Sequence, residues 1–502
     1  MKEFITAQEI RLVHPDDCAC ATDSYYARFA NKLYEHLRHF VGKDMPDKDF
    51  TRVLARKLTW YFEDIVADMG VWRMFSDLCM ELYGYPVPMY HAEEEYYPDE
   101  PSYNAVRYLV WDVAYEMFPD RLFDTDRLLL KMGQEAYRML NEAFENAPIN
   151  EEAKAKMDEM ISYAGEGFNE LRNVLGWMLM GCYITSGSWT SEDIHEKAKE
   201  LQGHEFYSKM NASMKQYVIL SDMKFTYHVG PLALKPYQWL GRLAKVTGHD
   251  DVAKMTGDID VLGTDTYKYK YDEASEDSPV TLENTHGKVI EVSRKELNLD
   301  PKVLQMHNGC VAAFVFYKGE WRLNGVIAPL ELAEGDFEAI RNDQDDIPKE
   351  GSRFGTAEDL LKWTDGQRIV YFKDSTEMLT YLRDKLKYPA NITDNKELKS
   401  LPSPCMFIDD KAKIDNQCFA PMIELSIKDP ANPYYDPKKA KEEAINILWD
   451  TKGTTSNFAD YLIDQNFLPD AEHSFVFSQE ATHEQRIADM HFFVRTSRRS
   501  KY

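Results

Sequence analysis

The sequence lacks the local motifs by which many enzymes are recognised. It has no GxSxG nucleophile elbow, no HExxH zinc-protease motif, no Walker A phosphate-binding loop and no GxGxxG dinucleotide fingerprint. These absences exclude enzymes whose site is encoded in one short segment, and leave open a site assembled from distant residues. The sequence therefore predicts no catalytic residue, and it favours a protein that is not an enzyme.

Positive charge is also scarce. The 502 residues include 85 Asp and Glu against 59 Lys and Arg, which gives a net charge of −26. An acidic protein repels a phosphate backbone before any contact forms. The one basic run found, residues 495–501, is typical of a solvated tail. Nucleic acid is therefore disfavoured as a partner, and another protein is favoured.

Paired cysteines and long apolar runs are missing as well. Seven cysteines are scattered along the chain, an odd number that does not form a disulfide framework. The most apolar run, residues 174–184, is too short to span a bilayer. The first ten residues lack the apolar core and cleavage site of a secretory signal. We expect a cytoplasmic protein with no membrane partner.

The patterns that are present predict an α+β multidomain fold. Apolar residues recur at helical spacing through residues 1–255, which indicates a large all-α N-terminal domain. Residues 266–330 are rich in β-forming residues and turn signals and predict a small antiparallel, barrel-like β-module. Residues 330–355 are acidic and contain Gly and Pro, as expected of a linker. Residues 356–502 alternate between strand and helix patterns and predict a mixed α/β C-terminal domain.

Four aromatic residues of the β-module allow two interpretations. Tyr267, Tyr269 and Tyr271 alternate with charged residues, as in a strand with one buried face, and Trp321 lies on a later strand. The four rings could form an exposed surface that binds a partner. Alternatively they fill the core, because small barrels depend on aromatic residues for burial.

A carboxylate cluster is the most suggestive candidate for a metal site. Glu63, Asp64 and Asp68 lie on one predicted helix, with Asp64 and Asp68 one turn apart, and His91 lies on the acidic loop that follows. Oxygen-rich ligand sets suit Mg²⁺, Ca²⁺ or Mn²⁺. The alternative is a solvated helix face whose carboxylates pair with nearby Lys and Arg side chains. No cofactor is predicted, although this cluster would allow a divalent cation.

Metal-binding side chains also gather near the N-terminus, at His14, Asp16, Asp17, Cys18 and Cys20. Zinc sites usually separate the cysteines of a pair by two to four residues and use a second pair of ligands elsewhere. The Cys18-Ala-Cys20 spacing is tighter than this, and the sequence contains no second pair of cysteines. The spacing therefore argues against zinc.

Five segments of the chain carry a resemblance to a known family: residues 22–26 (TDSYY), 61–72 (YFEDIVADMGVW), 96–100 (YYPDE), 317–325 (YKGEWRLNG) and 429–437. In these segments the chain resembles an uncharacterised bacterial family classed only as a domain of unknown function. The resemblance implies a bacterial, intracellular setting and brings no functional residue with it.

Two hypotheses of function follow. The leading one is a cytoplasmic bacterial protein-interaction or scaffold protein without its own catalysis, because catalytic motifs are missing and acidic and aromatic surfaces suit a protein partner. The alternative is an enzyme that depends on a divalent metal, for example a hydrolase, and that uses the carboxylate cluster of the helical domain.

Overall fold

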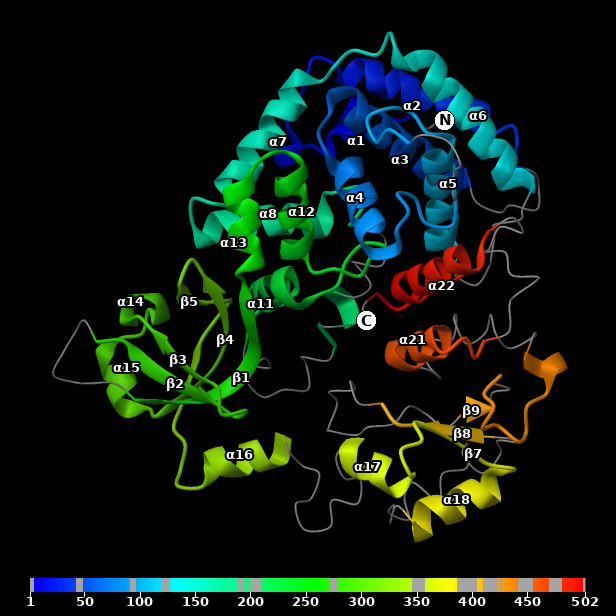
Figure 1. The fold of residues 1–502 in the computed structure, drawn as a ribbon. Helices are drawn as coiled ribbons and strands as arrows, with labels where there is room; N and C mark the ends of the chain where they lie inside the picture. Colours follow the sequence, from blue (N-terminus) through cyan, green and yellow to red (C-terminus); the bar gives the residue numbers. More distant parts are fainter. Residues whose placement is uncertain are drawn as a thin grey trace. The chain divides into compact units, whose positions relative to one another are not determined.

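The structure is a computed structural model. It describes residues 4–41, 48–90, 96–118, 127–187, 194–196, 198–199, 210–270, 278–344, 357–385, 404–409, 423–424, 427–440, 455–468, 481–499 and 502. The fold is α+β, as the sequence predicted: N-terminal helices are followed by a curled antiparallel sheet, and a small second sheet lies in the C-terminal part (Figure 1).

The chain forms two compact units. The first contains Met1–Glu283, Val289–Leu330 and Glu480–Asp489, and the second contains Asn284–Lys288, Glu331–Gln479 and Met490–Tyr502. The helical domain and the β-module, which the sequence analysis separated, therefore share one unit.

The first unit begins with helices whose ends follow from local sequence. Thr6 and Glu9 form a capping box at the start of α1, and Ser102, Asn150 and Asn211 each accept a backbone hydrogen bond at the start of a later helix. The elements are α1 (Ala7–Arg11), the 3₁₀ helix η1 (Pro15–Asp17), α2 (Asp23–Leu37), α3 (Lys48–Ala67), α4 (Val71–Tyr83), α5 (Tyr103–Met117), α6 (Arg127–Phe144), α7 (Glu151–Tyr163), α8 (Phe168–Met180), α11 (Ala212–Thr226), α12 (Pro236–Val246) and α13 (Asp250–Gly257).

The curled sheet of the first unit has six strands. They are β1 (Asp260–Lys270), β2 (Val280–Asn284), β3 (Val289–Val292), β4 (Gly309–Tyr317), β5 (Glu320–Leu323) and β6 (Ala328–Leu330). Their order is β3-β2-β1-β4-β5, with β6 also paired to β4. The short helices α14 (Arg294–Leu297) and α15 (Pro301–Met306) lie between β3 and β4 in the chain. The strand pattern read from the sequence is confirmed, and β1 begins earlier than the alternation suggested.

The aromatic rings of the β-module lie mainly in its core. Tyr267 is fully buried and Tyr269 is 8 % exposed, and the ring of Tyr267 meets that of Phe314 edge-on with centroids 5.2 Å apart. Trp321 is partly buried against the same core. Tyr271 lies outside the described residues. Tyr267 and Tyr269 therefore cannot form an exposed binding surface. They fill the core of the β-module, which was the alternative interpretation.

Hydrogen bonds join the sheet to the helices of the first unit. The side chain of Asn324, just after β5, donates from Nδ2 to the carbonyl oxygen of Ser221 in α11 at 2.9 Å. The hydroxyl of Tyr317 donates to the carbonyl oxygen of Ala164, just after α7, at 3.3 Å. Both hydrogen bonds link residues more than 100 positions apart in the chain, so the sheet and the helices stabilise each other.

The second unit contains α16 (Asp336–Gln344), α17 (Ala357–Trp363), β7 (Ile369–Tyr371), α18 (Ser375–Asp384), β8 (Pro404–Phe407), β9 (Ile423–Glu424), α21 (Ser456–Asp464) and the larger part of α22 (His483–Ser497). Strands β7, β8 and β9 form an antiparallel sheet in that order. The predicted linker 330–355 is partly wrong, because α16 lies within it. Asp336, the first residue of α16, accepts a hydrogen bond from the backbone of Ala333. In the described part of the chain, no helix is both long and apolar enough to cross a membrane.

Candidate metal centre

The side chain at the centre of the site is His14, which is 2 % exposed and lies between α1 and η1. Its Nε2 is 3.1 Å from Oε2 of Glu63, a fully buried carboxylate of α3. Asn150, at the start of α7, donates from Nδ2 to the other oxygen of Glu63 at 2.7 Å, and its own Oδ1 accepts from the backbone of Ala153 at 3.0 Å. Two helices thus orient the His14 ring, with Nε2 directed at Glu63 and Nδ1 turned away from it.

Two thiols lie on the Nδ1 side of this ring. Sγ of Cys20 is 3.8 Å from Nδ1 of His14 and 3.7 Å from Sγ of Cys18. In a tetrahedral zinc site, with Zn–S about 2.3 Å and Zn–N about 2.0 Å, two sulfurs are about 3.8 Å apart and sulfur and nitrogen about 3.5 Å apart. His14 and Cys20 are buried, whereas Cys18 is partly exposed. The two distances from Cys20 are therefore close to those that zinc requires, and all three donor atoms lie within 4.8 Å of one another.

Asp23, the first residue of α2, adds an oxygen. Its Oδ2 accepts from the backbone of Cys20 at 3.0 Å and pairs with Nε of Arg11 at 3.7 Å. Its Oδ1 is 4.0 Å from Nδ1 of His14, is buried, and has no hydrogen-bond partner among the residues that the structure describes. A buried acceptor without a donor destabilises a fold. Asp23 thus lies next to, but outside, the group of donor atoms that are all within 4.8 Å of one another.

Negative charge is unfavourable at this site in the absence of a metal. Burial raises the pKa of Cys18 and of Asp23, and burial, with a further contribution from Cys18, raises the pKa of Cys20 to about 12. Burial lowers the pKa of His14, but the hydrogen bond and charge of Glu63 outweigh this effect, so that the pKa of His14 is raised. Without a metal the two thiols therefore favour their protonated forms, and a bound divalent cation would favour the thiolates instead.

The carboxylates that the sequence grouped on one helix turn to different partners. Glu63 faces the imidazole, as described above. Asp64, which is 1 % exposed, accepts from the backbone of Val71 at 3.1 Å and of Trp72 at 2.6 Å, and from the hydroxyl of Tyr183 at 2.8 Å. Burial raises the pKa of Asp64 to about 6. Asp64 therefore caps the start of α4.

Asp68 lies beyond the end of α3 and on the surface. The helix ends at Ala67, and Asp68 has a left-handed backbone conformation with φ 54° before the chain turns at Gly70, where φ is 89°. The carboxylate pairs with Arg73 and, at 3.3 Å, with Lys154. The prediction that Asp64 and Asp68 lie one helical turn apart on one helix is therefore wrong. Asp68 instead forms surface ion pairs, which was the alternative interpretation.

Among the described residues, one group of three or more His, Cys, Asp or Glu side chains lies within reach of a single ion, and it consists of His14, Cys18 and Cys20. His91, the fourth residue of the predicted carboxylate site, lies outside the described residues. Sequence reasoning found the three donors but missed Asp23. Asp23 begins α2, and an acidic residue at the start of a helix is more typical of a cap than of a metal ligand.

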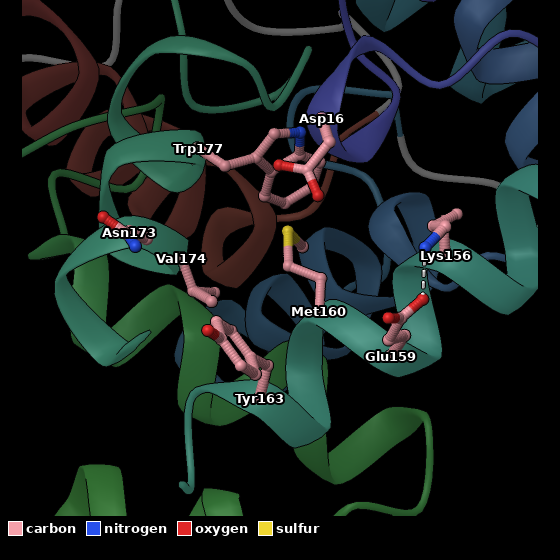
Figure 2. A pocket seen from close by; sticks show the side chains of 8 residues that line it. All are labelled: Asp16, Lys156, Glu159, Met160, Tyr163, Asn173, Val174 and Trp177. Carbon is pink, nitrogen blue, oxygen red and sulfur yellow. Dashed lines mark hydrogen bonds and ion pairs between the residues drawn. The ribbon is translucent and has the colours of Figure 1, made fainter. Parts of the chain in front are cut away.

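A pocket of about 400 Å³ lies beside η1, the 3₁₀ helix between His14 and Cys18 (Figure 2). Its lining comes from η1, α7 and α8, and consists of Asp16, Lys156, Glu159, Met160, Tyr163, Asn173, Val174 and Trp177. Asp16 precedes Cys18 by two residues, and the positive charge of Lys156 favours the thiolate of Cys18. The pocket and the metal centre therefore share η1 as a common wall.

Comparison with known proteins gives one finding. No curated protein matches the chain, and no solved structure matches it. A family profile, described as protein of unknown function (DUF3843), matches residues 5–274 and 336–496, which include all the residues of the metal centre. The match covers most of the chain, and the chain therefore belongs to this family of proteins of unknown function.

Proposed function

We propose that this protein binds a zinc ion through His14, Cys18 and Cys20, with Asp23 as the fourth ligand. The observation that carries the proposal is the convergence of one imidazole nitrogen and two thiol sulfurs within 4.8 Å of one another. Thiolate and imidazole are the ligands that zinc prefers, whereas Mg²⁺, Ca²⁺ and Mn²⁺ prefer oxygen. The donor set therefore favours zinc over the cations that the carboxylate cluster suggested.

The role proposed for the ion is structural. Four protein ligands close a tetrahedral site, while catalytic zinc keeps one position for water or substrate. The ligands all come from the N-terminal segment 14–23, and the residues that orient His14 come from α3 and α7. Bound zinc would therefore fasten the N-terminal segment to the helices behind it, and its binding energy would add to the stability of the fold.

A structural metal is compatible with a protein-interaction or scaffold role, which we propose for the whole chain. The partner proposed is another protein, because the net charge of −26 opposes nucleic acid. The cytoplasm is the proposed location, since a reducing compartment keeps thiols such as Cys18 and Cys20 free to bind metal.

The test is cobalt substitution with measurement of metal content. Protein purified under reducing conditions should contain about one zinc ion per chain. After exchange, Co²⁺ should show the strong d–d bands of a tetrahedral ion and thiolate-to-cobalt charge-transfer bands. Cys20→Ala should lose most of the charge-transfer intensity and the zinc.

The matched control is Cys79→Ala, which removes another buried thiol, in α4, a helix that contributes no ligand to the proposed zinc site. This variant should retain both the zinc and the cobalt spectrum. Metal-free protein that shows no tetrahedral cobalt spectrum would refute the proposal, as would equal loss of metal in the two variants.

A further inference from the structure

The pocket beside the metal centre carries an inference that does not rest on zinc. Its volume of about 400 Å³ lies within the range of small-molecule sites. Two of its walls are the facing surfaces of α7 and α8, and the third is η1. In Figure 2 the carboxylate of Asp16 and the indole of Trp177 lie together on one side, and the thioether of Met160 points toward them.

The charges in this pocket do not balance. Lys156 and Glu159 pair with each other, with Nζ and Oε2 2.5 Å apart. The carboxylate of Asp16 has no hydrogen bond or ion pair with any residue that the structure describes, and acts on Lys156 only at longer range. One negative charge is therefore left over, so the pocket favours a cation over an anion or a neutral ligand.

The backbone of η1 holds Asp16 toward the pocket. Asp16 has φ 53° and Asp17 has φ 49°, a left-handed conformation that Asp tolerates better than most residues. Of these two exposed carboxylates, Asp16 lines the pocket. Asp16 and Asp17 thus have the same backbone conformation and are both exposed, but only Asp16 is among the residues that line the pocket.

The rest of the pocket suits the apolar part of an organic cation. The indole of Trp177 is held in place because its Nε1 donates to the carbonyl oxygen of Val13 at 3.1 Å. Its face and that of Tyr163 offer the aromatic surfaces that attract ammonium and guanidinium groups. Met160 and Val174 supply apolar surface between α7 and α8. A hydrated inorganic cation would leave this apolar surface uncovered, whereas an alkyl chain would bury it.

We propose that this pocket binds a small organic cation, with an alkylammonium or guanidinium group between Asp16 and Trp177 and its alkyl chain against Met160 and Val174. The carboxylate sets the charge of the ligand, and the aromatic and apolar side chains set its organic character. Because η1 forms part of both the pocket and the proposed zinc site, the bound ligand would lie next to residues 14–23.

The test uses two probes of the same shape, butylguanidinium and butylurea, of which only the first is charged. Protein labelled with 5-fluorotryptophan reports binding by fluorine NMR, and loss of one signal in Trp177→Phe assigns the resonance. We expect butylguanidinium to shift the Trp177 signal with saturation at millimolar concentration, and butylurea to leave it unchanged. The fluorine signal requires neither bound zinc nor enzymatic activity. This test therefore remains valid even if the protein binds no zinc.

The matched variants are Asp16→Asn and Asp17→Asn, because asparagine also tolerates the left-handed backbone. Asp16→Asn should weaken butylguanidinium binding about two- to fivefold, as expected for an exposed ion pair, while Asp17→Asn should bind as the unchanged protein does. The inference is overturned if no saturable shift appears up to about 10 mM, if butylurea binds equally well, or if the two variants behave alike.

Discussion

Replacing Glu63 by glutamine tests how the metal centre is built without touching a ligand. The carboxylate accepts from Nε2 of His14 at 3.1 Å and from Nδ2 of Asn150 at 2.7 Å. The Asn150 amide cannot turn over freely, because its Oδ1 already accepts from the backbone of Ala153. A glutamine at position 63 has one acceptor for these two donors.

The size of the effect follows from this mismatch. When His14 binds zinc through Nδ1, its Nε2 must carry a proton, so one donor always faces the NH₂ group of the new glutamine. Without zinc, His14 can move the proton to Nδ1 and the conflict disappears. Metal binding must therefore leave one buried donor unsatisfied, which costs about 1–3 kcal/mol. We expect the zinc dissociation constant of Glu63→Gln to rise about 10- to 100-fold, as for other residues that orient metal ligands.

The assay is competition for zinc against a chromophoric chelator at constant pH and salt. The matched control is Asp64→Asn, which changes the next residue of α3, also buried, but disturbs the cap of α4 instead of the histidine. Asp64→Asn should lower the free energy of unfolding by about 1–3 kcal/mol, measured with urea in the presence of chelator, and leave the zinc affinity unchanged. Unchanged affinity in Glu63→Gln, or an equal loss in both variants, would contradict this account.

Two further predictions concern other charged groups. Burial lowers the pKa of His491, but its hydrogen bonds to Asp460 at 2.9 Å and Asp464 at 3.0 Å outweigh this and raise it. The stability that His491 provides is therefore complete below about pH 6.5 and lost as pH rises through the raised pKa, and urea unfolding of His491→Gln should not show that loss. Burial, and next the charge of Arg172, lower the pKa of Lys224 to about 8. Lys224→Met should raise the free energy of unfolding at pH 7 by up to about 1 kcal/mol, since solvent screens a partly exposed charge, and urea titrations should show this gain shrinking at higher pH.

Much of the fold could be predicted because local patterns determine it. Strand β2 (Val280–Asn284) lies within the predicted β-module, between a proline that precedes it and a turn that follows it. The helix hidden in the predicted linker was missed because its sequence, rich in Asp and Glu, has few apolar residues to reveal a period. That the helices and the curled sheet belong to one compact unit could not be predicted. It depends on contacts between residues far apart in the sequence, such as Asn324 and Ser221.

The candidate metal centre could be predicted only in part. His14, Cys18 and Cys20 stood out as donors, but spacing rules for zinc describe ligands on regular hairpins and helices. Here the left-handed turn of η1 folds the chain back, so that a shorter spacing still brings both thiols to the imidazole. The role of Glu63 was hidden, because a buried carboxylate and a solvated one look alike in sequence.

The hydrogen bonds that join sheet and helices have a consequence for how the chain can be divided. A fragment that ends after α13 would lack the two residues that donate these hydrogen bonds, Tyr317 and Asn324. The carbonyl oxygens that accept them would lose these donors. It would also uncover the ring of Phe168, which lies 5.7 Å from that of Tyr317. The helices and the curled sheet should therefore melt in one cooperative transition, and a truncation that ends after Leu330 should be more stable than one that ends before Asp260.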